Sequence, residues 1–263
     1  MRIVGTGEPT LIFVHGYACA GDDWDRQLDA LSKNFRCVAL NLPGHGGSAV
    51  PGTASIEAMA AAVNKVKEQM GGGSVVLIGH SMGCRVVTQA YRQSPTNVAG
   101  LVFVDGSRFA GDLASRVGIT TDVIDRGDAD AALACSFADM FFDGSDPEIR
   151  QYIIRRALSL DLAFRTKLTP QVLRWDVEEA EEALKQVAVP TLVLQSTSIR
   201  ADHTRAPLQP GMTTPWMDLV AKLVPLSNAK IITGAGHFTM IEAAPALNEE
   251  IARFAGKLEH AVF

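Results

Sequence analysis

Short apolar runs recur along the chain and alternate with segments whose apolar residues fall at helical spacing. Each run is rich in β-branched residues and has the length of a strand buried on both faces of a parallel sheet. The intervening segments repeat apolar positions every three or four residues, which is typical of helices that cover such a sheet. This rhythm predicts an α/β fold of parallel βαβ units, with strands at 10–14, 35–40, 74–78, 98–104, 190–195 and 229–233.

The rhythm breaks between residues 107 and 187. Roughly 80 residues there carry no strand signal, far more than an ordinary connection needs. Helix-start signals appear instead, at Asp128, at Asp146-Pro147 and at Thr169-Pro170. We therefore expect an α/β core formed by residues 1–107 and 188–263, with residues 108–187 inserted as a helical cap, or lid, over the sheet edge.

The composition is that of an ordinary globular protein, with 47% hydrophobic and 20% charged residues. The net charge is −5 and the basic residues are scattered, which argues against nucleic acid as a partner and against a polybasic membrane patch. No apolar run approaches the roughly 18 residues of a membrane helix, and the first residues lack a signal-peptide core. Four cysteines without metal-like or disulfide-like spacing are expected to be reduced thiols. We expect a cytoplasmic protein that does not insert into a membrane.

A five-residue motif, Gly79-His80-Ser81-Met82-Gly83, fits G-x-S-x-G directly after the apolar run at 74–78. Helical spacing follows it, so the motif has the strand–turn–helix context in which such a serine acts as a nucleophile. A turn this tight puts the serine into strained backbone angles, and the residues two positions away on either side must be small. Gly79 and Gly83 meet that requirement. Ser81 is therefore the candidate nucleophile.

A serine hydroxyl needs a base within hydrogen-bond reach, and His237 is the best placed of the six histidines. It lies in a glycine-flanked loop after a predicted strand, and loops at the carboxyl ends of parallel strands form active sites. Three others, His15, His45 and His80, sit in tight turns and are expected to hold loops through hydrogen bonds. The histidines show no metal-binding spacing, and no dinucleotide or phosphate-binding loop is complete, so we expect neither a metal ion nor a cofactor.

Acyl transfer also needs donors for the oxyanion of a tetrahedral intermediate. The main-chain N–H of Met82 is one candidate, because it begins the helix after Ser81, where the helix dipole adds positive potential. The main-chain N–H of Tyr17 is the other, since Gly16 before it lets the backbone approach a substrate closely.

Four segments of the chain resemble, in the same order, recurring segments of α/β-hydrolase-fold enzymes: HGYACAGDDW, NLPGHGGS, GHSMG and GAGHFTMIEAAP. The resemblance covers nearly the whole chain and is weak only in the 107–187 insertion, which would correspond to the family's cap. It implies Ser81 as nucleophile, His237 as base, and Tyr17 and Met82 as oxyanion donors. Family members usually have more strand before the first segment than residues 1–4 supply, which leaves open whether the first edge strand is missing.

The acid expected beside His237 has two candidates. Many family members carry an Asp after the strand that corresponds to 190–195, but here that stretch continues Gln195-Ser-Thr-Ser-Ile199 without an acid. Asp202 comes three residues late, beside arginines that could simply pair with it. The other position used in the family is the end of the preceding strand, where Asp105 stands. Asp105 is the favoured acid and Asp202 the alternative, and either would orient His237 and stabilise its imidazolium.

These residues favour a serine esterase that cleaves carboxylic esters of small to medium apolar acyl or aryl substrates through an acyl-enzyme. A carbon–carbon bond hydrolase or a lactonase on the same triad is the alternative enzyme. From a different class, a ligand-sensing module could keep the triad with negligible turnover. The expected partner is a small-molecule ester, and the oligomeric state stays open. Five residues of the insertion suggest an apolar pocket, although helical spacing also explains them as lid core: Phe109, Phe137, Met140, Phe141 and Phe142.

Overall fold

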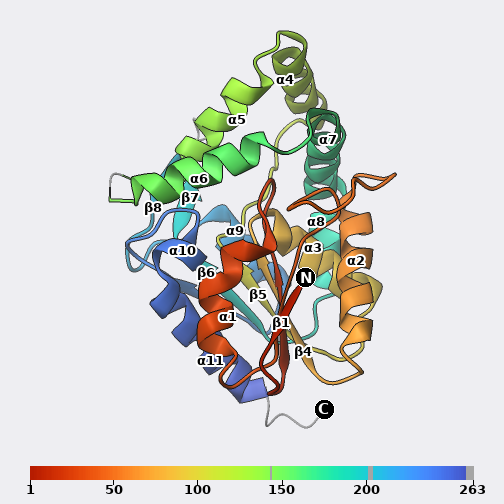
Figure 1. Ribbon diagram of the computed structural model, residues 1–263, viewed down its shortest axis with the longest axis vertical. Coiled ribbons are helices and arrows are strands. Elements are labelled where there is room, and N and C mark those ends of the chain that lie inside the picture. Colours follow the sequence, from red (N-terminus) through yellow and green to blue (C-terminus); the bar gives the residue numbers. More distant parts are fainter. Residues whose placement is uncertain (143, 201–203, 259–263) are drawn as a thin grey trace.

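The computed structural model of the chain describes residues 1–142, 144–200 and 204–258, with the backbone alone for residues 119–121. Within these residues the centre is a seven-stranded sheet in the order β1-β3-β2-β4-β5-β6-β9 (Figure 1). Neighbouring strands run parallel except for β1, which pairs antiparallel to β3 at one edge. The strands of this sheet are β1 Arg2–Val4, β2 Thr10–Val14, β3 Cys37–Leu40, β4 Val75–His80, β5 Val98–Val104, β6 Thr191–Gln195 and β9 Ser227–Ile231.

The predicted α/β fold is confirmed, because the five central strands are buried along their whole length. Four predicted boundaries are wrong by two residues: the start of β3, both ends of β9, and the end of β4, which continues to His80. Strand β3 begins at Cys37 and not at residue 35, because the main chain of Phe35 still donates to Leu31 at the end of a helix. Strand β9 begins at the polar residue Ser227 and not at residue 229, since pairing with β6 defines this edge strand and its side chains are only partly buried.

Helices cover both faces of the sheet (Figure 1). On one face α2 (Ile56–Gln69) packs against α3 (Met82–Gln93), followed by α8 (Ala180–Lys185) and α9 (Pro215–Leu223). On the other face α1 (Asp25–Leu31) packs against α11 (Ala244–Leu258), with the short helices η1 (Gly21–Trp24) and α10 (Thr239–Glu242) beside α1. These layers bury the apolar stripes of the helices against the strands, which is the main source of the core's stability.

Four helices between β5 and β6 gather at the carboxyl end of the sheet: α4 (Leu113–Asp125), α5 (Ala129–Ala138), α6 (Pro147–Leu158) and α7 (Leu162–Glu178) (Figure 1). The predicted start of α6 is correct, since Asp146 Oδ1 accepts the main-chain N–H of Glu148 at 2.8 Å. The predicted helix start at Thr169-Pro170 is wrong. Asp161 accepts the N–H of Phe164 at 2.7 Å and starts α7 earlier, so Pro170 lies inside the helix. An interior proline costs roughly 3 kcal/mol, and α7 buries Phe164, Leu168 and Trp175 in the core.

The structure also contains strands that the sequence left open or did not predict. Residues 2–4 form strand β1, which pairs antiparallel to β3 at one edge of the sheet, with Ile3 opposite Val38. After β6, strands β7 (Thr197–Ile199) and β8 (Arg205–Pro207) form a two-stranded antiparallel sheet that was not predicted. Each is only three residues long, too short to show an alternating pattern. No helix in the described part of the chain is long and apolar enough to cross a membrane.

Candidate active site

Ser81 occupies the turn between β4 and α3, with backbone angles of φ 54° and ψ −116°. A positive φ is unfavourable for a residue with a Cβ, so the surrounding structure must enforce it. A Cβ at Gly79 would lie 2.3 Å from the carbonyl oxygen of Gly83, and one at Gly83 would lie 2.4 Å from that of Val14. Both neighbours therefore have to be glycine, as the motif predicts. Ser81 itself is half-buried and accessible to a ligand.

Asp105 and His237 are joined by a hydrogen bond of 2.6 Å, from His237 Nδ1 to Asp105 Oδ2. Asp105 directly follows β5, and His237 lies in the loop after β9. The parallel strands bring these two distant segments to the same edge of the sheet. Both side chains are buried, with exposed fractions of 0% and 1%. The alternative acid, Asp202, lies outside the described residues.

The Asp105 carboxylate also accepts hydrogen bonds from the segment after β6. Its Oδ1 accepts the main-chain N–H groups of Ser196 at 2.8 Å and Thr197 at 2.7 Å, and the Ser196 hydroxyl at 3.0 Å. Its Oδ2 accepts the Thr197 hydroxyl at 2.5 Å and lies 3.4 Å from Arg205 Nη1. Burial alone would raise the pKa of Asp105, but His237, Arg205 and Thr197 outweigh burial and lower it to about 2. Asp105 is therefore ionised at neutral pH.

Ser196, Thr197 and Arg205 belong to no motif that identifies them from the sequence. The one available signal is that hydroxyl residues stand where many family members carry the acid. These hydroxyls donate to a carboxylate on the neighbouring strand instead of supplying one. The Ser196 hydroxyl also lies 2.8 Å from the carbonyl oxygen of Gly236, so the same residue contacts the acid and the loop of His237.

Burial and the positive charge of Arg205 lower the pKa of His237 to about 4, although Asp105 opposes them. The ring is therefore neutral at pH 7. Since Nδ1–H donates to Asp105, the lone pair of the neutral ring is on Nε2, the nitrogen that a general base needs. Ser81 and His237 line the same cavity, but among the described residues no hydrogen bond joins their side chains. Such bonds are often long before substrate binds.

Three buried histidines hold loops of the site, as predicted. Leu42 donates its main-chain N–H to His15 Nε2 at 2.9 Å. The Nδ1 atoms of His15 and His45 lie 2.8 and 3.1 Å from main-chain carbonyl oxygens. His80 Nε2–H donates to the carbonyl oxygen of His237 at 2.9 Å. Burial lowers the pKa of all three rings, so they are neutral hydrogen-bonding groups at pH 7.

The two predicted oxyanion donors belong to segments that flank Ser81. Met82 is the first residue of α3, where main-chain N–H groups lack partners within the helix. A Cβ at Gly16 would lie 3.1 Å from Ser81 Cβ, so the backbone just before Tyr17 lies against the candidate nucleophile. The Tyr17 side chain reaches the other way, and its hydroxyl lies 3.1 Å from Thr169 Oγ1 in α7.

A cavity of about 460 Å³ lies between the sheet edge and helices α4, α5 and α7. Ser81, His237, Tyr17 and Met82 line its floor, together with apolar side chains of the inserted helices. Of the five insertion residues that the sequence suggests for a pocket, Phe137 and Met140 line this cavity. Phe141 is instead buried and stacks on Phe238 with ring centroids 5.1 Å apart. The cavity has a size typical of small-molecule sites.

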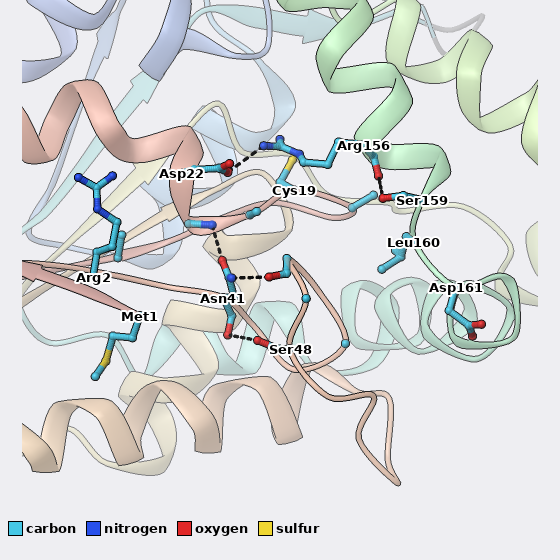
Figure 2. Close-up of a pocket in the computed structure, with 17 residues that line it drawn as sticks. Met1, Arg2, Cys19, Asp22, Asn41, Ser48, Arg156, Ser159, Leu160 and Asp161 are labelled. Carbon is cyan, nitrogen blue, oxygen red and sulfur yellow. Dashed lines mark hydrogen bonds and ion pairs between the residues drawn. The ribbon is translucent and has the colours of Figure 1, made fainter.

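A second cavity, of about 560 Å³, lies beside the glycine-rich loop that follows β3 (Figure 2). Asn41 organises this loop, accepting the N–H of Gly21 at 2.7 Å and donating to the carbonyl oxygen of Gly46 at 2.7 Å. This cavity has no histidine among the described residues that line it, so its serines have no imidazole to act as their base. Across the described residues, no group of three or more histidine, cysteine or acidic side chains is placed to hold a metal ion.

Comparisons with known proteins agree with the α/β fold. Residues 9–124 match a family model described as the alpha/beta hydrolase fold. A pimeloyl-[acyl-carrier protein] methyl ester esterase of Sodalis glossinidius is 35% identical over 112 residues, which are 42% of this chain and 42% of that protein. The first curated relatives are matched over 6% to 42% of their own length, less than half in each case.

Solved structures match over a larger share of the chain. A thermophilic esterase from Thermogutta terrifontis superposes with a TM-score of 0.79 at 23% identity, covering 98% of this chain and 92% of that one. A bromoperoxidase from Bacillus anthracis gives a TM-score of 0.79 at 18% identity, covering 96% and 93%. At these identities the likeness is one of fold. The sheet order and these neighbours show that the chain has the α/β-hydrolase fold, and residues 9–124, fewer than half of its 263 residues, match the family model.

Proposed function

We propose that this protein is a serine hydrolase that cleaves carboxylic esters of small to medium apolar acyl or aryl substrates through an acyl-enzyme. One observation carries the proposal. The Asp105–His237 hydrogen bond of 2.6 Å lies at the cavity that is also lined by Ser81, which is held at positive φ in a nucleophile turn. A purely structural role gives no reason for a strained serine, a neutral buried histidine and an ionised buried aspartate at one cavity.

In this mechanism Ser81 Oγ attacks the ester carbonyl carbon while its proton passes to His237 Nε2. Ionised Asp105 keeps the proton of His237 on Nδ1 and stabilises the imidazolium that forms. The carbonyl oxygen becomes an oxyanion and accepts hydrogen bonds from the main-chain N–H groups of Tyr17 and Met82. When the intermediate collapses, the leaving alcohol takes the proton from Nε2. Water then attacks the acyl-enzyme by the same steps, releasing the acid and restoring Ser81.

Helices α4 to α7 act as the cap in this proposal, covering the carboxyl end of the sheet and holding the acyl or aryl group. Phe137, Met140, Val172 and Leu173 supply apolar surface to the cavity and support an apolar substrate. An ester is also the substrate named for the methyl ester esterase relative.

The test is a panel of p-nitrophenyl esters of increasing acyl length, together with labelling by a fluorophosphonate. We expect hydrolysis and stoichiometric labelling of the wild type, and neither for Ser81→Ala at an unchanged melting temperature. The matched control is Ser94→Ala, a serine at the other end of α3. The absence of both hydrolysis and labelling in the wild type would rule out the proposal.

Lactones and ring-cleavage diketones belong in the same screen, because the same side chains could serve a lactonase or a carbon–carbon bond hydrolase. Turnover of those compounds without ester hydrolysis would reassign the reaction while keeping Ser81 and His237. Ligand-dependent melting shifts without any turnover would favour a sensing module.

A further inference from the structure

The charged residues that line the catalytic cavity all have the same sign. Three arginines line it, Arg85, Arg116 and Arg165, and no aspartate or glutamate is among the described lining residues. The rest of the lining is mostly apolar. A cavity with low-dielectric walls and one sign of charge concentrates ligands of the opposite sign. The three arginines differ, however, in whether their charge is already neutralised inside the protein.

Arg85 is fully paired inside the protein, and its role is structural. Its Nε and Nη2 donate to the two carboxylate oxygens of Asp176 at 2.6 and 2.7 Å, and both side chains are buried. This bidentate pair ties α3, just after Ser81, to α7. The Asp176 carboxylate also accepts the N–H of Phe109 at 2.8 Å. The charge of Arg85 is neutralised by Asp176, so Arg85 does not need a ligand anion.

Arg165, on the cavity face of α7, is different. It is 7% exposed, and its Nε is buried without a hydrogen-bond partner among the described residues. Its ion-pair partner is Asp130, at 2.5 Å from Nη2, but 67% of the Asp130 side chain is exposed. Because water screens the charge of so exposed a carboxylate, the ion pair between Asp130 and Arg165 is weak. A buried N–H without an acceptor is unfavourable, so a small shift of the side chain that brought this nitrogen to a ligand oxygen would stabilise the guanidinium.

Arg165 also has a defined position relative to the reaction centre. Thr169, one helical turn further along α7, contacts the Tyr17 hydroxyl at 3.1 Å, and Tyr17 carries one of the proposed oxyanion donors. Leu173 continues the same face of the helix and lines the cavity.

We propose that the cavity selects esters that carry a carboxylate, such as monoesters of dicarboxylic acids, and that Arg165 binds this carboxylate. The inference rests on the proposed esterase function. Arg116, from α4, also lines this cavity. The apolar side chains between them and Ser81 contact the methylene chain. A carboxylate fits better than a phosphate, because the single under-satisfied guanidinium matches a single negative charge.

The experiment compares two methyl esters of equal size, one ending in a carboxylate and one in the neutral carboxamide, over chains of two to six methylenes. We expect the wild type to prefer the carboxylate in kcat/KM by about 10- to 100-fold, the range of a charge-assisted hydrogen bond. Arg165→Gln should bring that ratio to about 1, and taking the ratio of the two esters within one variant cancels any change in activity that both esters share. Arg174→Gln is the control, since Arg174 lies on α7 but pairs with Glu57 and Glu178 away from the cavity lining.

The outcomes separate the inference from the function on which it rests. If the wild type hydrolyses both esters with equal kcat/KM, the carboxylate site is overturned and the esterase function is retained. This result needs no variant. An equal ratio in wild type and Arg165→Gln also overturns it. Preference for a phosphonate-ended ester over the carboxylate overturns the assignment of the anion. Failure to hydrolyse any ester, with Ser81 unlabelled, removes the proposed function itself.

Discussion

His80, the residue before Ser81, donates its Nε2–H to the main-chain carbonyl oxygen of His237 at 2.9 Å. The two imidazole rings are 4.5 Å apart, and both are buried. One side chain therefore links the turn of the candidate nucleophile to the loop of the candidate base, although His80 and His237 are 157 residues apart in the sequence. The bond sets where the His237 backbone lies without using the His237 ring, which stays free to bond Asp105.

Replacing His80 should affect catalysis through the position of His237. His80→Leu removes the donor and should lower kcat by about 10-fold with little change in KM, because misplacement of a base affects the chemical step. His80→Gln keeps an N–H donor and should retain most of the activity. Steady-state kinetics on one p-nitrophenyl ester checks this. Equal losses for the two variants would show that ring volume matters and not the hydrogen bond.

Asp105→Asn should lower kcat by roughly 10² to 10⁴-fold, by analogy with the acid of other triads, because the amide favours the wrong tautomer of His237. The buried N–H groups of Ser196 and Thr197 keep an acceptor in the amide oxygen, so folding should be nearly intact. Asp202→Asn is the control and should change kcat little. A large loss of kcat in Asp202→Asn together with a small loss in Asp105→Asn would instead identify Asp202 as the acid that orients His237.

The acid limb of the pH–rate profile should lie far below the usual histidine range. His237 acts as a neutral base, so kcat/KM falls only when pH drops through its pKa of about 4. Arg205 lowers this pKa, so Arg205→Met should raise it and move the acid limb to higher pH, although loss of the Arg205 charge also affects Asp105. Profiles of kcat/KM from pH 3.5 to 8 measure the shift.

Arg253→Met is the matched control for that profile, because Arg253 is a surface residue of α11 paired with Glu249 and Glu250. It should leave the acid limb in place. A wild-type limb near pH 6.5, or a limb that Arg205→Met leaves in place or moves down, would contradict the electrostatic role given to Arg205.

Gly83→Ala should destabilise the fold, because the new Cβ would lie 2.4 Å from the carbonyl oxygen of Val14 and the backbone must shift. Overpacking of this kind costs about 1–3 kcal/mol. Gly118→Ala, inside α4 with nothing within 4 Å of the new Cβ, should instead gain about 0.5–1 kcal/mol. Urea unfolding of both variants measures the difference. A stable Gly83→Ala protein would mean that the turn can relax.

Features encoded in a few consecutive residues were predictable. The central strands are continuous apolar runs because both faces of the sheet are covered, and such runs can be read directly. The turn at Ser81 depends on two glycines within five residues, and the helix cap at Asp146 depends on one side chain and the next two residues. Two helix-start signals lie close together at Asp161 and at Thr169-Pro170, and there the pattern predicted the wrong start for α7.

The sequence by itself determined the layered α/β fold, the turn that strains Ser81 and the loop that carries His237, because each depends on local spacing and backbone geometry. Only the tertiary structure decided that Asp105 contacts His237, since strand order brings β5, β6 and β9 together. The same holds for the hydroxyls of Ser196 and Thr197 around that carboxylate, and for the exposed partner that leaves Arg165 under-satisfied. Contacts between segments far apart in the chain have no local pattern, so packing alone reveals them.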